Sequence, residues 1–330
     1  MIISLLLFLL GIAIILGGAA VFTNGVEWLG RRMGISDGAI GSILAGIATA
    51  LPETLIPVIA IFGGHSETET DIGIGAILGA PLMLGTLTLP LLAGFVLLLA
   101  RRRKRSKQFE LDYHAVRLDL GFFLGGYGLA FLVSFTPVAP VRYAVAFALI
   151  LSYLWYVKIH LTSGEVSGME IAPLYLARHS RRPATGLIVV QALLGLALMI
   201  GGANMFVHLV KDVALHLGVS PLILSLLIAP VATEMPEAMN SFFWVYKKKD
   251  ALAVGNITGA MVFQGTFPVA VGLLGTRWAL DTGSLLSLIL PLAASTIFLL
   301  QIQMYGRWQS RTLILPGFLY AGYMGYLFFR

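Results

Sequence analysis

Two short stretches of the chain set carboxylates, hydroxyls and prolines among apolar residues, in runs long enough to cross a bilayer. The first reads Thr49-Ala50-Leu51-Pro52-Glu53 and the second reads Thr233-Glu234-Met235-Pro236-Glu237. An ionisable side chain inside a membrane span costs roughly 3 kcal/mol on insertion scales, and by default it marks an ion or proton site. Carboxylate, hydroxyl and carbonyl oxygens are hard ligands that suit calcium, magnesium or sodium. The two stretches therefore predict a cation site.

The spacing inside each stretch brings its oxygen atoms to one side of a helix. Thr49 and Glu53 are four residues apart, as are Thr233 and Glu237, and side chains at this spacing share a helix face. Glu234 falls three residues before Glu237, close to the same face. Each copy of the motif thus predicts a hydroxyl beside a carboxylate.

The prolines are expected to interrupt both helices. Pro52 has no amide hydrogen for the carbonyl of Ala48, and Pro236 has none for the carbonyl of Ala232. A freed carbonyl in a dry environment needs a donor, a water molecule or a cation. The structural alternative is that the prolines are only kinks and that the threonines bond to their own helices. Three glutamates at related positions favour an ion site over structural pairing.

Composition places these stretches in a membrane protein. Charged residues make up 12% of the chain, apolar residues 58%, and the mean hydropathy is +0.89. An ordinary soluble domain has roughly 25% charged residues. The net charge of +6 comes from short basic clusters between apolar runs, which set topology and do not indicate a nucleic-acid partner. Without cysteine there is no disulfide and no zinc–thiolate site.

Cuts at the polar and basic clusters divide the chain into ten apolar spans, each close to the ~20 residues that a membrane helix needs. The expected helices cover residues 2–30, 36–63, 71–100, 115–135, 141–161, 185–214, 220–246, 251–276, 283–304 and 312–329. The connections on one side are basic and contain residues 31–32, 101–105, 178–182, 247–249 and 307–311. The positive-inside rule puts these connections in the cytoplasm and both termini outside. The expected location is a prokaryotic inner (plasma) membrane.

The chain also contains an internal repeat. Residues 17–53 align with residues 201–237 without a gap, and twelve of these 37 positions are identical. Five helices per half is an odd number, so the second half is inserted upside down. The predicted fold is therefore an all-α membrane protein with ten transmembrane helices as two inverted five-helix repeats, 1–161 and 185–330, joined by a cytoplasmic connection over 162–184. Inverted repeats with binding residues on interrupted helices are typical of secondary transporters.

These motifs resemble those of the cation/calcium antiporter superfamily, which includes the sodium/calcium exchangers. Its repeats combine a Thr-Ser-Leu-Pro-Glu type sequence with a Gly-Asn-x-x-Gly-Ser-Asn-x-x-Asn/Asp type sequence on the next helix. Here the next helices read Gly75-Ala76-Ile77-Leu78-Gly79-Ala80 and Gly255-Asn256-Ile257-Thr258-Gly259-Ala260. The resemblance covers helices one to three and six to eight. It implies an antiporter with one central site that opens alternately to each side.

The departures from the family pattern bear on the coupled ion. The family's serine after the threonine is Glu234 in the second copy, and its third-helix serines are Ala80 and Ala260. Its further amide or acid is matched by Leu84 and Gln264. Sodium sites that depend on the missing groups are weakened, which favours proton coupling or a different cargo. Glu234 is expected to replace a lost third-helix acid.

Calcium takes about six to eight oxygen ligands. The ligands that the resemblance and the residues together imply are carboxylates, hydroxyls, one amide and two backbone carbonyls, with water completing the shell: Glu53, Glu234, Glu237, Thr49, Thr233, Gln264, Ala48 and Ala232. Three like charges in one apolar site cannot all remain ionised, so at least one carboxylate is expected to hold a proton when the site is empty, and Glu234 is the expected one.

The sequence therefore predicts a secondary active antiporter that exchanges calcium for sodium or protons, with inorganic cations and membrane lipid as its partners. No cofactor is expected, and the oligomeric state stays open. Two alternatives remain. One is an intramembrane enzyme with the glutamates as acid and base, although no zinc or acid-protease motif supports it. The other is a passive cation channel.

Overall fold

The computed structural model describes residues 2–33, 50–64, 66–102, 106–136, 138–163, 172–180 and 182–329. Within these ranges the regular structure is entirely helical, as predicted. The chain divides into two compact units: unit 1 contains Met1–Gly73 and Leu154–Pro221, and unit 2 contains Ile74–Tyr153 and Leu222–Arg330. Each unit takes segments from both halves of the chain, so the units are a different division from the sequence repeats.

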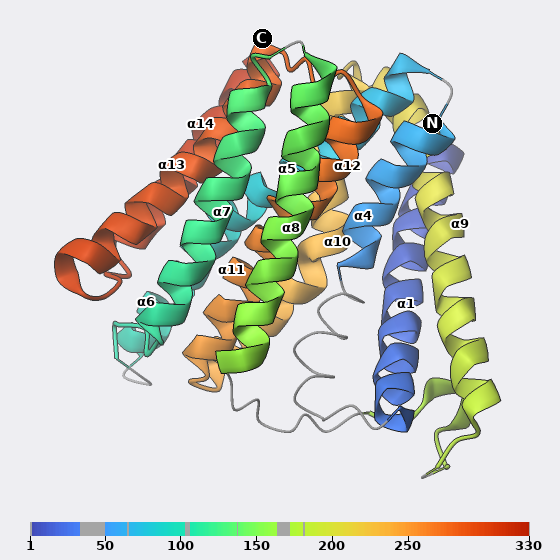
Figure 1. Cartoon of the computed structure of the whole chain (residues 1–330), viewed down its shortest axis with the longest axis horizontal. Helices are drawn as coiled ribbons and strands as arrows, with labels where there is room; N and C mark the ends of the chain where they lie inside the picture. Colours follow the sequence, from blue (N-terminus) through green and yellow to red (C-terminus); the bar gives the residue numbers. More distant parts are fainter. Residues whose placement is uncertain are drawn as a thin grey trace. The chain divides into compact units, whose positions relative to one another are not determined.

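Figure 1 labels the helices of both units. Unit 1 contains α1 (Ile2–Arg32), α4 (Leu51–Val58), η2 (Ile59–Gly63), η4 (Tyr175–Ala177) and α9 (Thr185–Leu217). Unit 2 contains η3 (Leu84–Thr88), α6 (Leu89–Arg101), α7 (Tyr113–Val133), α11 (Asp250–Gln264), α12 (Phe267–Gly275), α13 (Thr282–Tyr305), η5 (Thr312–Ile314) and α14 (Leu315–Phe329), together with nearly all of α10 (Pro221–Tyr246). Two helices continue from one unit into the other, α5 (Glu67–Met83) and α8 (Ala139–Ser163).

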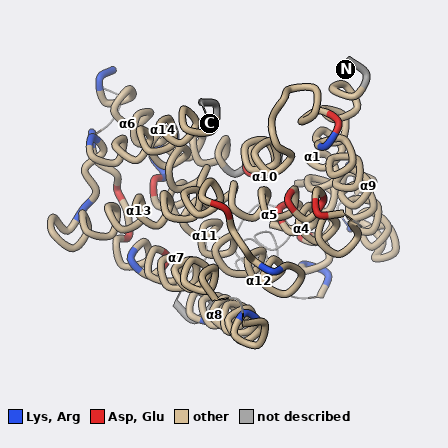
Figure 2. Tube along the Cα trace, turned by 90° about the horizontal axis from the view of Figure 1, so that it is seen from above, with Lys and Arg blue, Asp and Glu red and all other residues tan. Residues whose placement is uncertain are grey.

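Seven helices of the described chain are long and apolar enough to cross a membrane, and the bent helix α10 makes an eighth if it is one span. Charges are sparse along these helices, and most of the trace in Figure 2 is neither acidic nor basic. Helices of this kind can cross a bilayer, because a helix satisfies its backbone hydrogen bonds internally. The coarse class of the predicted fold is therefore confirmed.

The helix boundaries follow the predicted spans closely. The span predicted over 71–100 is observed as a continuous helical run, Glu67–Arg101, through α5, η3 and α6. The span predicted over 251–276 is observed as Asp250–Gly275, with a local interruption between α11 and α12 that was not predicted. The cause is Pro268 in the first turn of α12, because a proline cannot continue the hydrogen bonding of the preceding turn. The span predicted over 36–63 is described only from residue 50 onward.

In unit 1, α1 and α9 lie side by side along their lengths (Figure 1). Small residues on both helices let the backbones approach, as in many membrane helix pairs. A β-carbon added at Gly195 would overlap the backbone of Phe22, and one added at Gly18 would lie 2.8 Å from the backbone nitrogen of Met199. The open side of α9 differs, because a β-carbon at Gly201 would meet no atom within 4 Å.

This difference makes a testable pair of substitutions. Gly195→Ala is expected to lower the free energy of unfolding by about 1–3 kcal/mol, the usual effect of overpacking a tight contact. Gly201→Ala is the matched control on the same helix and is expected to be neutral or slightly stabilising, because alanine is the better helix former. The measurement is thermal unfolding of both variants in detergent. Equal midpoints for the two variants would contradict the close packing of α1 against α9.

A buried polar network ties one end of this helix pair to the connection that precedes α9. The side chain of Gln191 donates to Asn24 Oδ1 at 2.9 Å, and its own Oε1 accepts from the amide of Leu176 at 2.9 Å. Asn24 Nδ2 donates to the carbonyl of Ala172 at 3.1 Å. Arg32 Nε donates to Thr185 Oγ1 at 3.0 Å at the same end. In unit 1 the basic end of α1 therefore lies against residues 172–176 and the start of α9.

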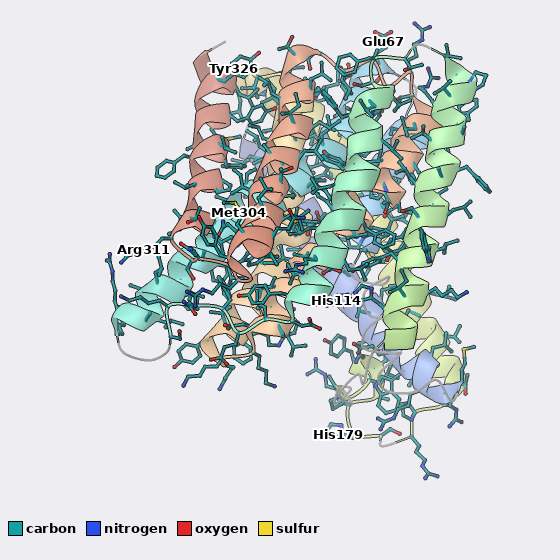
Figure 3. The ribbon with its side chains drawn as sticks, turned by 60° about the vertical axis from the view of Figure 1, so that its left-hand side comes forward. Glu67, His114, His179, Met304, Arg311 and Tyr326 are labelled. Atoms are coloured by element: carbon teal, nitrogen blue, oxygen red, sulfur yellow. The ribbon has the colours of Figure 1, made fainter. Side chains whose placement is uncertain are left out.

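In unit 2, three polar connections meet at one end. Arg307 donates to Gln108 Oε1 at 3.3 Å, and Ser310 Oγ donates to the carbonyl of Lys107 at 2.6 Å. The amide of Glu110 donates to Asp250 Oδ2 at 3.0 Å, next to the basic residues 247–249. Figure 3 shows His114 and Arg311 at this end of the unit and Tyr326 at the opposite end. Within the described part of this unit, the connections that contain the predicted basic clusters therefore meet at one end.

Candidate cation site

Glu53 lies in α4 of unit 1, in an apolar helix that begins at Leu51. Pro52 occupies the first turn, where the missing amide costs no intrahelical hydrogen bond. The Glu53 side chain is buried, with 6% of its surface exposed. The predicted ligands Ala48 and Thr49 fall outside the described residues. The structure thus places the first carboxylate in a short apolar helix, directly after a proline-marked helix start.

The second motif lies in α10, which bends by 47° where Pro221–Met235 meets Ala238–Tyr246. The bend coincides with Pro236, as the sequence analysis predicted. Thr233 is buried on this helix, and its hydroxyl donates to the carbonyl of Ala229 at 3.1 Å. A hydroxyl that donates its hydrogen keeps lone pairs for a further contact. Ala232 and Glu237 belong to α10, but their side chains are not described.

Glu234 is the most deeply buried of the described motif carboxylates, with 1% of its surface exposed. Its Oε1 accepts a hydrogen bond of 2.8 Å from Nε2 of Gln264, which is buried at the end of α11. Two of the residues expected at the site are therefore in direct contact, although 30 positions separate them. A carboxylate in apolar surroundings needs such a donor when it carries its charge.

The break after Gln264 adds a further oxygen that the sequence analysis missed. Pro268 has no N–H to donate to the carbonyl of Gln264, which stands four residues earlier. The hydroxyl of Thr266 turns back to the carbonyl of Val262 at 2.7 Å. The side-chain amide of Gln264 thus donates to Glu234, and its backbone carbonyl receives no hydrogen bond from the nitrogen of Pro268. The sequence feature that could have predicted this break is Pro268, which lies inside a long apolar span.

Gly75 and Gly79, the two glycines of the motif on α5, let this helix pack closely against α10. A β-carbon added at Gly79 would overlap the carbonyl of Leu226, and one added at Gly75 would lie 2.5 Å from the carbonyl of Leu222. Leu226 is four residues before Pro230, so its carbonyl also lacks the amide of a normal helix. The close approach of α5 at Gly79 covers this carbonyl. The two motif glycines thus set the packing of the helix that carries Glu234.

The described side chains do not by themselves form a complete metal site. No group of three or more histidine, cysteine, aspartate or glutamate side chains at metal-binding distance occurs among them. Of the predicted site residues, Glu234 and Gln264 are in contact, and Thr233 precedes Glu234 on α10. Glu53 belongs to unit 1.

Another buried carboxylate, Asp119 on α7, was not predicted. It is 3% exposed and accepts a hydrogen bond from the hydroxyl of Thr258 on α11. The rule that identified the glutamates applied to it as well, because the predicted span 115–135 contains it.

A membrane protein with buried carboxylates on interrupted apolar helices has the features of a cation transporter. The family model described as sodium/calcium exchanger protein matches residues 3–162 and 187–329. The chain therefore belongs to the sodium/calcium exchanger family. The predicted membership in the cation/calcium antiporter superfamily is confirmed, and with it the general class of function, cation antiport.

Several known proteins are similar over most of their length. The putative antiporter CaxA of Alkalimonas amylolytica is 24% identical over 300 residues, which is 86% of this chain and 84% of that protein. The inner membrane protein YrbG of Escherichia coli is 24% identical over 80% of this chain and 77% of its own length. Among solved structures, the H+/Ca2+ exchanger CAX matches with a TM-score of 0.76 at 17% identity, covering 98% of this chain and 86% of that one. The sodium-calcium exchanger NCX_Mj matches with a TM-score of 0.60 at 20% identity, covering 98% of both chains. These structures share the fold.

Proposed function

We propose that the protein exchanges calcium for sodium or protons by alternating access at a site of buried carboxylates. The observation that supports this most directly is Glu234, 1% exposed on a bent apolar helix and held by Gln264 beside a second helix break. Carboxylate, amide and carbonyl oxygens at this point are the ligands that calcium takes. The compared structures are named for calcium exchange against H+ or sodium, which supports the same cargo here.

Glu53 and Glu237 are proposed to complete the site. The proposal rests on the sequence repeat, in which the two residues occupy equivalent positions, and on the burial of Glu53 in α4. Equivalent residues of inverted repeats flank a shared midplane site in many transporters. The finer fold proposed with it is ten membrane helices as two inverted five-helix repeats, with the ion path between carboxylates of both repeats.

Protons are the favoured counter-ion. Two third-helix positions that carry serine in the family pattern are Ala80 and Ala260, and a further polar position is Leu84. These side chains supply no oxygen for a sodium ion. A proton needs only a carboxylate, and Glu234 supplies one in a site with other acids.

The deciding experiment is uptake of radiolabelled calcium into proteoliposomes, with a sodium gradient or a proton gradient imposed one at a time. Antiport predicts saturable uptake that depends on one of the gradients and collapses when that gradient is removed. Uptake that ignores both gradients would identify a passive channel instead. An intramembrane enzyme would form a lipid product in the same vesicles without calcium movement.

Both termini are proposed to lie outside and the basic connections inside. The basic end of α1 lies against residues 172–176 and the start of α9 in unit 1, and the three connections of unit 2 meet at one end, so the charge bias is consistent within each unit. A single cysteine at Ser106, which is exposed, is expected to resist an impermeant reagent added to intact cells, whereas a cysteine at exposed Glu67 should react. Labelling of Ser106→Cys from outside would reverse the orientation.

A further inference from the structure

Asp119 is a buried carboxylate whose partner lies on the helix that ends at Gln264. It lies six residues inside α7 and is 3% exposed, and Thr258 opposite it on α11 is fully buried. Thr258 Oγ1 donates to Asp119 Oδ2 at 2.5 Å. This distance lies at the short end of the range for a hydroxyl that donates to a charged carboxylate. The contact lies wholly within unit 2.

The hydroxyl of Thr258 has two acceptors within reach. Besides Asp119 it lies 3.1 Å from the carbonyl of Val254, one turn earlier on α11. A hydroxyl has one hydrogen, so it can point fully at only one of these oxygens at a time. When Asp119 is ionised, the hydrogen points to the carboxylate. When Asp119 is protonated, the acid can donate to Thr258 Oγ1 and the hydroxyl hydrogen can turn to Val254. The geometry therefore suits both protonation states.

The titratable and charged groups around Asp119 come from α7 and from the helices packed against it. On α7, α11 and α13 the other such groups are Tyr113, His114, Arg117, Tyr127, Asp250 and Tyr305. Helix α8, which reaches Gly126 through Leu149, carries Arg142, Tyr143, Tyr153, Tyr156, Lys158 and His160. Arg117 donates to the carbonyl of Ile302, and Asp250 accepts from the amide of Glu110 at the end of α11. From α11, Asp119 receives the hydrogen bond of the Thr258 hydroxyl.

Contacts between α7 and α11 continue from this pair to the helix break beside Gln264. A β-carbon at Gly265 would lie 2.8 Å from the ring of Phe123, and one at Gly126 would lie 3.0 Å from Thr266. The contacts advance in the same direction along both helices, so α7 runs parallel to α11 and reaches the residues next to Gln264. A change in the hydrogen bond between Asp119 and Thr258 therefore also changes the packing of α7 against the residues next to Gln264.

We propose that Asp119 and Thr258 form a proton-binding site in unit 2, separate from the glutamate site and coupled to it through α11. A proton from water binds the Asp119 carboxylate, and the charge-assisted bond to Thr258 becomes a neutral one of roughly half the strength. The interaction between α7 and α11 becomes weaker, and the hydrogen bond between Gln264 and Glu234 becomes weaker with it. The coupling part of this inference rests on the proposed exchange of calcium, whereas proton binding at Asp119 does not.

The test compares calcium uptake into proteoliposomes across a range of pH for the parent, Asp119→Asn, Thr258→Val and Thr296→Val. Thr296 is the matched control, because it is exposed on α13 and its hydroxyl donates to the carbonyl of Leu292 four residues back, as Thr258 does to Val254. Asp119→Asn should reduce the pH dependence of uptake and leave the part that is due to Glu234. Thr258→Val should move the pH of half-maximal uptake upward, because the ionised carboxylate loses its stronger bond. Thr296→Val should follow the parent.

Infrared spectroscopy of the purified protein gives a second readout that needs no transport. The carbonyl band of a protonated aspartic acid should grow as the pH falls in parent protein labelled with carbon-13 at the aspartate carboxyls. Thr258→Val should move this band, and Thr296→Val should leave it in place, so the site is tested even if Asp119→Asn fails to fold. Identical bands and uptake profiles in parent, Thr258→Val and Thr296→Val would overturn the proton site. No uptake in the parent under either gradient would instead overturn the proposed exchange, with the infrared result still deciding the site.

Discussion

Replacement of Glu53 or Glu237 by glutamine is expected to abolish calcium transport. Each change removes one negative charge and one oxygen ligand, while the shape of the side chain is kept. The loss of an outer hydrogen-bond partner already weakens metal binding by about 10–100-fold in other proteins, so the loss of a direct ligand should exceed about 100-fold. The apolar surroundings offer no substitute, because Glu53 is buried among apolar residues in α4.

Glu67→Gln is the control for these variants, because Glu67 is exposed at the start of α5 and its replacement also removes one negative charge. Calcium uptake and calcium binding are measured for the three variants, and thermal unfolding in detergent confirms that each one is folded. Full transport by folded Glu53→Gln protein would show that this carboxylate is not a ligand. A loss of transport in Glu67→Gln of the same size would assign the effect to overall charge.

The features that could be predicted from the sequence are those set by local chemistry. The span boundaries follow from runs of apolar residues, and the bend in α10 follows from Pro236, because a proline removes a hydrogen bond wherever it stands in a helix. The burial of Glu53 and Glu234 follows from their apolar neighbours on the same helix. The contact between Gln264 and Glu234 was anticipated only as shared membership of one site, through the resemblance of both motifs to a family.

The features that were missed depend on other parts of the chain. Thr258 was part of a motif, but its partner Asp119 lies 139 positions away, and no local pattern connects the two. The need for glycine at Gly79 comes from the backbone of α10 against it, which is a property of the packed helices. The break after Gln264 was overlooked although Pro268 marks it, because the apolar run continues through it. The division into two compact units likewise reflects contacts between distant segments.

The pH dependence of calcium binding is expected to be largely lost in Glu234→Gln. In the parent, like charges from three carboxylates favour one bound proton in the empty site, and a divalent cation must displace it. Apparent affinity should therefore weaken by up to about tenfold per pH unit as the pH falls, since metal binding that releases a proton is pH-dependent. Glutamine at position 234 keeps an oxygen that can accept from Gln264 Nε2, as Glu234 Oε1 does at 2.8 Å, but it holds no proton to displace.

Gln264→Met separates the charge of Glu234 from its hydrogen bond. This variant removes the donor at 2.8 Å but keeps the carboxylate, and an ionised carboxylate without that donor is disfavoured in apolar surroundings. Glu234 then retains its proton to higher pH, so calcium affinity should weaken while its dependence on pH is kept. Calorimetry in buffers with different ionisation enthalpies measures both quantities, because the heat reports the number of protons released with each calcium ion. About one proton released by the parent and by Gln264→Met, and close to none by Glu234→Gln, would assign the exchanged proton to Glu234. Equal proton release in all three proteins would assign it to another group.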